Sequence, residues 1–518
     1  MKVRHDLDLP PGVPKVRVSA FTDDPNRASP VVLRFHADEF ETSSTEGGLV
    51  GPNVAVKMNA QRSNGDWIYS PEDERMAATT AYVAVRSTLD AAEDLLRMKI
   101  PWGDGKRLEV GKYETDSYNL NAHYDPTTRS LSIGHAIQPG ADQTEAFDPT
   151  FRSENLAYNL ALAPDVLAHE AGHAVFDVLK PITALELSSH TDKASLNEGI
   201  ADCFAFLTAL KQGTVLGRAL SDTALDLSRP NALSEIGDSL GEVFAYGGMP
   251  SDGPLRSLIN SKVREPGKVY EEHEGGEIIG GAFYDLFLAI HAQNAKLNTP
   301  RSQALSAGDS AGAIFLNALK FTPDDGNLSF EDFGRGVVLA ALKLSGGKYQ
   351  GQVRDVLVKR NLLSASEVDA TIARHAQRQQ FPLRIDPSTF VGKAQAEALL
   401  PELRQTFGLK ADAVLEPSRV ERDDYGFTRI VYFQPRANKA AELADEELNQ
   451  AYGAVDRDAL LSRGAFTVVF DPRGKVVTAF NQIDTGVNIN IAGKLGDGSP
   501  AAVDTPMLSP SALDHDHD

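Results

Sequence analysis

Two histidines and a glutamate occur together in one short run, Ala168-His169-Glu170-Ala171-Gly172-His173. Histidines four residues apart on a helix share a face and can hold one metal ion, while the glutamate between them reaches a water on that ion. A bare run of this kind also occurs on surface helices, so its surroundings matter. Pro164 suits a first helical position, Asp165 lies in the first turn, and Pro181 follows Lys180, which predicts a helix from about 164 to 180. A zinc site on this helix is the leading hypothesis.

Two histidines do not complete a zinc site, and the next acidic motif is Ser195-Leu196-Asn197-Glu198-Gly199-Ile200-Ala201-Asp202. Glu198 is the candidate third ligand. The alternative is that Ser195 and Glu198 form a capping box, in which the carboxylate only closes a helix start. Asp202 lies one turn after Glu198 on the same face, where it can accept the other N–H of a ligand histidine. Capping does not require Asp202, so the pair favours a metal site.

In these two motifs the chain resembles the thermolysin-like zinc metallopeptidases, the gluzincins, whose signature is H-E-x-x-H followed by N-E-x-x-x-D. The resemblance implies that His169, His173 and Glu198 bind zinc. It also implies that Glu170 is the general base and proton shuttle, and that Asp202 orients a ligand histidine. The segment between the two motifs is longer than in thermolysin, which places an insertion around 180–194.

Three further segments match the family in order. The run Asn121-Ala122-His123-Tyr124-Asp125, followed by Ser130-Leu131-Ser132-Ile133-Gly134, is similar to the family's segment and edge strand that hold extended substrate. The likeness implies that Asn121 and Ala122 bind peptide backbone; a turn after a strand is the alternative. Leu255-Arg256-Ser257-Leu258 resembles the stretch whose arginine contacts the substrate carbonyl. His273, before a predicted helix, would stabilise the oxyanion. Taken alone, Arg256 is typical of a solvated surface residue and His273 of a structural one.

The chain departs from the family at several positions. Residues 174–197 contain no tyrosine, so either His273 acts alone on the oxyanion or His190 or another group substitutes. The aspartate expected five residues before His273 is Lys268, and Glu271 or Glu272 is expected to support His273 instead. Asp165 occupies the position of a calcium ligand in the family, but Ala209, Leu210 and Lys211 stand where further acidic residues are needed. The double calcium site is therefore not predicted, and calcium binding is left open.

The predicted architecture is α+β, a two-lobed thermolysin-like metallopeptidase with a mixed N-terminal lobe and a helical C-terminal lobe. Short strands at 16–18 and 31–35 predict a small N-terminal β region over 1–75, and the catalytic domain is expected over 76–365, beginning with a helix from Met76 to Leu96. A helix over 393–407, a strand over 428–433 and a hairpin over 466–480 predict an accessory α+β domain at 380–485. The Gly-, Pro-, Ser- and Asp-rich end, 486–518, predicts a disordered tail.

The chain has 518 residues and a net charge of −21, with a pI near 5.0. This charge argues against nucleic-acid partners and against an anionic membrane surface. The first residues lack the apolar region of a secretory signal, which predicts a cytoplasmic protein, whereas family analogy predicts a secreted one. A single cysteine, Cys203, excludes an internal disulfide.

The function expected from the resemblance is that of a zinc endopeptidase acting on peptides or proteins. It would cut on the amino side of an apolar residue, with Val166 and Leu255 lining that pocket. One alternative is an inactive metallopeptidase-like scaffold that binds proteins, which the missing tyrosine favours. Another is an exopeptidase, since insertions that close one end of a cleft are not visible in sequence. The oligomeric state is left open.

Overall fold

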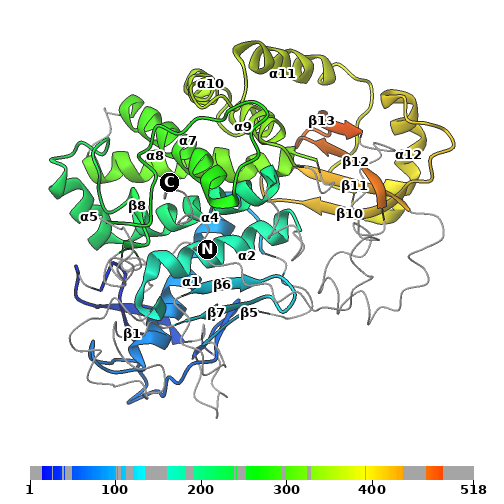
Figure 1. Cartoon of the computed structure of the whole chain (residues 1–518). Helices are drawn as coiled ribbons and strands as arrows, with labels where there is room; N and C mark the ends of the chain where they lie inside the picture. The colour runs from blue at the N-terminus through cyan, green and yellow to red at the C-terminus, as the bar shows by residue number, and fades with distance from the viewer. Residues whose placement is uncertain are drawn as a thin grey trace, which may run out of the picture.

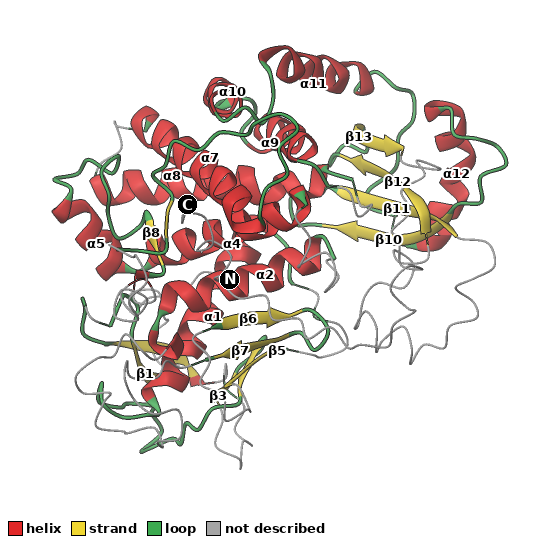
Figure 2. Ribbon diagram, in the orientation of Figure 1, coloured by secondary structure: helices red, strands yellow, loops and turns green. Residues whose placement is uncertain are grey.

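The computed structural model shows an α+β protein in which helices outnumber strands in the middle of the chain and sheets occur near both ends (Figure 1, Figure 2). The structure describes residues 15–25, 27–37, 40, 49–100, 102, 107–112, 121–134, 160–181, 191–238, 241, 253–294, 299–323, 328–390, 392–435 and 462–481. Among these residues no helix has the length and apolar character needed to cross a bilayer. The α+β class predicted from the sequence is confirmed.

The first two strands form an antiparallel hairpin. β1 (Lys15–Ala20) pairs with β2 (Val31–His36), with Ala20 opposite Val31. Alternate residues of β1 are buried, as the alternation of Val16 and Val18 with charged residues predicts. Both short strands predicted in this region are confirmed.

A five-stranded sheet follows, and it provides one wall of the candidate site. Its order is β3-β4-β5-β7-β6, so β6 is an edge strand while β7 lies inside the sheet. The β4–β5 and β5–β7 pairs are parallel, whereas β6 and β7 are antiparallel. The strands are β3 (Leu49–Val50), β4 (Val54–Val56), β5 (Leu108–Lys112), β6 (Ala122–Asp125) and β7 (Ser130–Ile133). The edge strand β6 contacts helix α2, which carries the histidines.

Helices build the centre of the molecule. They are α1 (Met76–Leu96), α2 (Pro164–Leu179), α4 (Asp192–Lys211), α5 (Gly213–Asp222), α7 (Glu272–Gln293), α8 (Pro300–Ala318), α9 (Phe330–Leu344), α10 (Gln350–Lys359) and α11 (Ala365–Arg378). The predicted bounds of α1 are confirmed, and those of α2 differ from the prediction by one residue. Helix α4 packs against both α2 and α7, and a two-residue ribbon, β8 (Glu235–Ile236) with β9 (Arg256–Ser257), lies nearby. One continuous apolar core joins these helices to the sheet.

The C-terminal elements form an antiparallel sheet of order β10-β11-β12-β13, with α12 packed against β10. The elements are α12 (Lys393–Phe407), β10 (Glu416–Arg422), β11 (Thr428–Pro435), β12 (Ser462–Phe470) and β13 (Val476–Asn481). The predicted hairpin is confirmed: Val469 pairs with Thr478 across the turn at 471–474. Gly474 has a φ of 70°, and a Cβ at this position would lie 1.8 Å from the carbonyl oxygen of Ile385, so that turn position requires glycine. The sequence analysis missed β10.

A second apolar cluster lies between α12 and this sheet, with Leu399 and Leu403 packed against Ile430 and Phe466. The division of the chain at 75, 365 and 380 stays a prediction. The tail predicted over 486–518 lies outside the described residues.

Candidate metal centre

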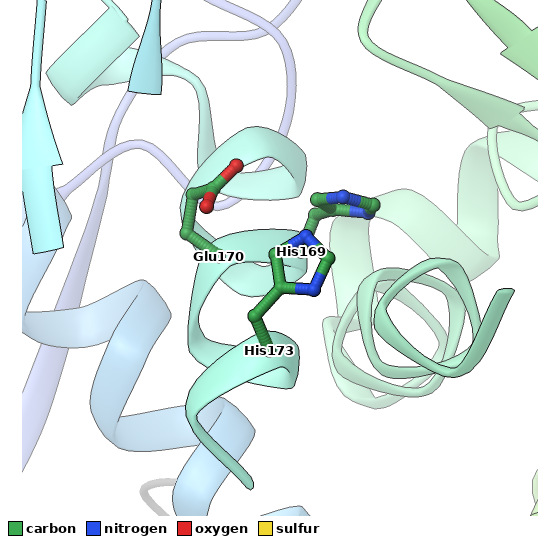
Figure 3. Close-up of side chains that lie close together, drawn as sticks. All are labelled: His169, Glu170 and His173. Carbon is green, nitrogen blue, oxygen red and sulfur yellow. The ribbon is translucent and has the colours of Figure 1, made fainter. Parts of the chain in front are cut away.

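Helix α2 places His169 and His173 one turn apart, as the spacing predicts. Their ring centroids are 4.5 Å apart, and both residues are buried, His169 completely. Figure 3 shows the two rings beside each other on the helix, with Glu170 on the adjacent position. Atoms of His169, Glu170 and His173 that can bind a metal ion lie within 4.8 Å of one another. This group is a possible metal site.

Glu198 reaches these histidines from α4. The helix begins at Asp192, with the Thr191 side chain as its N-cap accepting the N–H of Ala194. The expected helix start at Ser195 is therefore wrong, and Glu198 lies in the second turn, too far along to close a capping box with Ser195. Oε2 of Glu198 lies 3.4 Å from His169 Nε2, and Oε1 lies 3.4 Å from His173 Nε2.

These separations are longer than direct hydrogen bonds and leave space between the rings and the carboxylate. A direct N–H···O bond is usually 2.7–3.2 Å long. A tetrahedral ion with bonds of about 2.0–2.2 Å holds its ligand atoms about 3.3–3.5 Å apart. Burial opposes ionisation of Glu198, but His273, His173 and His169 hold the pKa of its carboxyl well below the usual value. Glu198 thus places a carboxylate beside both ring nitrogens, with a different oxygen facing each, and Arg256 Nη2 also lies 3.3 Å from His169 Nε2.

The Nδ1 atoms of the two candidate ligand histidines differ: His169 Nδ1 lies against Asp202, whereas His173 Nδ1 has no hydrogen-bond partner among the described residues. Asp202 Oδ1 lies 2.8 Å from His169 Nδ1, which directs Nε2 of that ring toward Glu198. Burial and Arg256 lower the pKa of His169, but Asp202 and Glu198 outweigh them and raise it to about 9. Burial lowers the pKa of His173 to about 4, so that ring is neutral, the form that binds a metal.

Glu170 is 1% exposed and is held by the edge strand. Its carboxylate accepts the backbone N–H of Tyr124 in β6, and its Oε1 has no hydrogen-bond partner within the described part of the chain. The pKa of Glu170 is raised to about 8, chiefly by burial and also by Glu198, while His169 and Arg256 act to lower it. A buried carboxylate oxygen without a partner is costly, so it is expected to meet a ligand or a water there.

Arg256 lies in β9 and its guanidinium enters the same cluster. Nη1 donates to Glu198 Oε2 at 3.1 Å, and Nη2 lies 3.2 Å from Asp202 Oδ1. The side chain is buried, so the solvated alternative for this arginine is wrong. Its neighbours are the carboxylates of two candidate site residues, so a role toward substrate stays a prediction.

His273 lies in the first turn of α7. Its Nε2 is 3.6 Å from Glu198 Oε2, and its Nδ1 contacts Glu271, which also caps the helix by accepting the N–H of Glu274. Burial lowers the pKa of His273, but Glu198 and Glu271 outweigh it and raise that pKa above the usual value. Of the two glutamates named as possible supports, Glu271 makes this contact. Lys268 pairs with Glu274 instead.

Asn121 and Ala122 lie at the start of β6. The Asn121 carbonyl accepts the N–H of Gly134, and Ala122 pairs with Ile133 of β7. Since β6 is at the edge of the sheet, its outer side has no strand partner among the described residues. An edge strand in this position can pair with an extended peptide. Both residues stay predictions as binding residues.

Three residues that the sequence analysis gave no role support the site. The Tyr124 hydroxyl donates to Asp177 Oδ2 at 2.8 Å, which ties β6 to α2 at a second point. Asn197 contacts His173 and favours its protonated ring. Tyr124 and Asn197 lie inside the recognised motifs, and Asn197 directly precedes Glu198, so membership of those motifs was the available signal. Asp177, two turns after His169 on α2, had none.

The predicted insertion with His190, and the predicted calcium-ligand position Asp165, are not part of the cluster that the structure describes. Of the insertion predicted over 180–194, residues 182–190, including His190, lie outside the described residues, and 192–194 belong to α4. Asp165 accepts the N–H groups of Val166 and Gly237, at 2.9 and 2.7 Å. It belongs to neither of the two metal-type groups found among the described residues. Calcium binding therefore remains open.

No family model matches the chain, and neither does any curated protein. Among solved structures the chain is similar to the precursor of protealysin, a metalloproteinase from Serratia proteamaculans. That match has 16% sequence identity and a TM-score of 0.37, and it covers 63% of this chain and 90% of the other. A likeness this weak assigns neither fold nor activity, so the site has to be interpreted from its own geometry.

Proposed function

We propose that this protein is a zinc-dependent endopeptidase of the thermolysin-like, two-lobed type. One observation carries the proposal: Glu198, from α4, places one carboxylate oxygen 3.4 Å from His169 Nε2 and the other 3.4 Å from His173 Nε2, so a carboxylate lies beside both candidate ligand nitrogens. Two imidazoles and a carboxylate are the ligand set of catalytic zinc sites that keep a fourth position open. His169, His173 and Glu198 are the proposed ligands.

Zinc bound there would lower the pKa of a water to near neutrality and polarise the scissile carbonyl. Glu170 is the proposed general base. Its buried Oε1 has no hydrogen-bond partner among the described residues, so it can accept the proton of the attacking water and later return it to the leaving amine. The backbone N–H of Tyr124 fixes the other side of that carboxylate during both transfers.

Two cationic or N–H-donating groups flank the proposed ligands. His273 Nε2 lies 3.6 Å from Glu198, on the side opposite the histidine's contact with Glu271, and is the proposed donor to the oxyanion. Arg256 is the proposed donor to the substrate carbonyl next to the scissile bond. The edge strand β6, with Asn121 and Ala122, would hold the peptide extended beside α2.

The proposed substrate is a peptide or protein with an apolar residue on the carboxyl side of the cleaved bond. Val166 is fully buried in α2, and Leu255 is partly exposed just before β9. Leu255 also touches Gly237, which has a φ of 73°. Because Val166 has no exposed surface, Leu255 is the one of these two residues that could contact a substrate side chain.

The test is zinc content and casein cleavage of the purified protein, compared with Glu170→Gln and with a chelator control. Glu170→Gln should keep one equivalent of zinc, because Glu170 is not a proposed ligand, while cleavage should fall by about two to four orders of magnitude. Glu109→Gln, on the exposed side of β5, is the matched control and should behave as wild type. Zinc without turnover in the wild type would favour the scaffold alternative, and absence of zinc would refute the ligand set.

A further inference from the structure

Arg360 is a cation buried in the helical core, outside the metal centre. It follows α10 directly and is 1% exposed. A buried guanidinium destabilises the fold unless its N–H groups are matched by acceptors. Its Nε donates to Asp285 Oδ2 at 2.7 Å, Nη1 donates to Asn260 Oδ1 and to the Lys262 carbonyl at 2.7 Å each, and Nη2 donates to the Asn260 carbonyl at 2.9 Å.

Three of those four bonds go to the segment that follows Arg256 along the chain. Asn260 connects Arg360 to β9 and α7, because its side-chain amide donates to the Ser257 carbonyl and to the Glu277 carbonyl of α7, at 3.0 Å each. Ser257 is the neighbour of Arg256 in β9. A continuous set of hydrogen bonds therefore joins Arg360, Asn260 and the backbone beside Arg256.

This segment needs an external support. The ribbon that carries Arg256 has two residues in each strand, and the following residues, 258–271, form neither helix nor strand. A two-stranded ribbon of that length is not stable by itself. Arg360 adds a backbone contact as well, since its carbonyl accepts the N–H of Arg264 at 3.0 Å.

Helix α7 has a glycine, Gly281, at the point where the Arg360 side chain packs against it. A Cβ on Gly281 would lie 2.6 Å from Arg360 Nη1 and 2.8 Å from Asn260 Oδ1. Glycine inside a helix costs about 1 kcal/mol relative to alanine. Its presence at this position is explained by the close approach of the guanidinium, and this observation is independent of the hydrogen bonds.

We propose that Arg360 is a positioning residue for Arg256: it fixes the 257–262 segment and so holds the Arg256 guanidinium at Glu198 and Asp202, where it can meet substrate. The inference rests on the proposed function, in which Arg256 binds the substrate carbonyl. Without Arg360 the guanidinium of Arg256 would sample other positions. Misplacement of a substrate-binding group by about 1 Å can lower the rate of the catalysed reaction about a hundredfold.

Arg360→Lys is the informative change, because a lysine keeps the charge but cannot make the forked contacts. We expect kcat/KM for a quenched peptide to fall about 10- to 100-fold with zinc content unchanged. Lys359→Gln is the matched control: Lys359 pairs with the same Asp285 but is exposed and does not contact the 257–262 segment, so its kcat/KM should equal that of wild type.

A double-mutant cycle separates positioning from general destabilisation. If Arg360 acts through Arg256, then Arg360→Lys should cause little further loss in an Arg256→Lys background. Losses that multiply would overturn the proposal. Should Arg360→Lys fail to fold, Asn260→Ala breaks the same connection at a partly exposed position, and the same cycle applies to it.

A readout independent of activity distinguishes failure of this inference from failure of the proposed function. Amide hydrogen exchange over 257–264 should be faster in Arg360→Lys than in wild type or Lys359→Gln, while exchange in α8 and α9 is unchanged. Unchanged exchange over 257–264 would refute the positioning role. Faster exchange in a protein that cleaves nothing would support the structural connection and refute the endopeptidase.

Discussion

Three candidate functional side chains are oriented by a neighbour whose contacting group has no proposed contact with substrate. Asp202 orients His169, Tyr124 holds Glu170, and Glu271 contacts Nδ1 of His273. For an imidazole, the atom bound at Nδ1 decides what Nε2 presents to the site. The supporting carboxylates are therefore expected to matter nearly as much as the ligands.

Glu271→Gln tests this at His273. An amide does not hold a protonated ring as a carboxylate does, so the ring of His273 should lose orientation and charge. We expect kcat to fall about tenfold with zinc retained, since Glu271 is not a proposed ligand. Metal analysis checks that zinc is retained, and steady-state kinetics measure the fall in kcat. Glu265→Gln, an exposed partner of Lys268, is the control. Unchanged kcat in Glu271→Gln would show that His273 needs no support from Glu271.

At the scale of elements, glycines let α2, α4 and α7 approach closely enough for their side chains to meet. A Cβ on Gly172 of α2 would lie 2.7 Å from Ala201 Cα of α4. One on Gly276 of α7 would lie 2.6 Å from Glu198 Cβ. Contacts this short force backbone or side chains to shift. The distance from Glu198 to the histidines therefore depends on residues that carry no chemistry.

Gly276→Ala should move Glu198 and weaken metal binding. We expect zinc affinity to fall about tenfold or more and the melting temperature to drop, because helix backbones cannot shift freely in a packed core. Gly351→Ala in α10 is the control, since a Cβ there has open space and alanine favours the helix. Competition with a chromogenic chelator gives the affinity. Wild-type zinc affinity in Gly276→Ala would show that the crossing of α4 and α7 is not set by Gly276.

Across the whole molecule, buried ion pairs fasten the C-terminal sheet to the helices. Lys320, just after α8, pairs with Asp423 at 2.7 Å, and Lys343 of α9 pairs with Asp471 at 3.0 Å. Figure 1 shows the sheet β10–β13 lying beside the helical part. Burial lowers the pKa of Lys320, although Asp423 opposes this effect. The sheet is therefore attached by contacts whose loss leaves a charge without its partner in the interior.

Lys320→Ala should lower the free energy of unfolding by about 3 kcal/mol, because it leaves Asp423 buried without its cation. Arg354→Ala, which breaks the exposed pair with Asp369, should change it by less than about 1 kcal/mol. Denaturant unfolding of the two variants and wild type gives the comparison. Equal effects of the two changes would mean that the Lys320–Asp423 pair does not stabilise the junction.

The sequence by itself determined the local elements. Periodic apolar residues, Pro164 and the turn at 471–474 predicted α1, α2, α12 and the C-terminal hairpin, because these signals act between residues close in the chain. The H-E-x-x-H spacing likewise placed His169 and His173 on one face of α2.

Only the tertiary structure decided what Glu198 does and which residues support the site. The capping-box alternative was locally sound, and it fails because α4 begins at Thr191 and Asp192, a turn before the Ser-x-x-Glu motif. The contacts of Arg256 with Glu198 and of Arg360 with Asn260 join residues 58 and 100 positions apart. Such contacts depend on how α4, α7 and α10 pack, and no periodicity or spacing within one element specifies that packing.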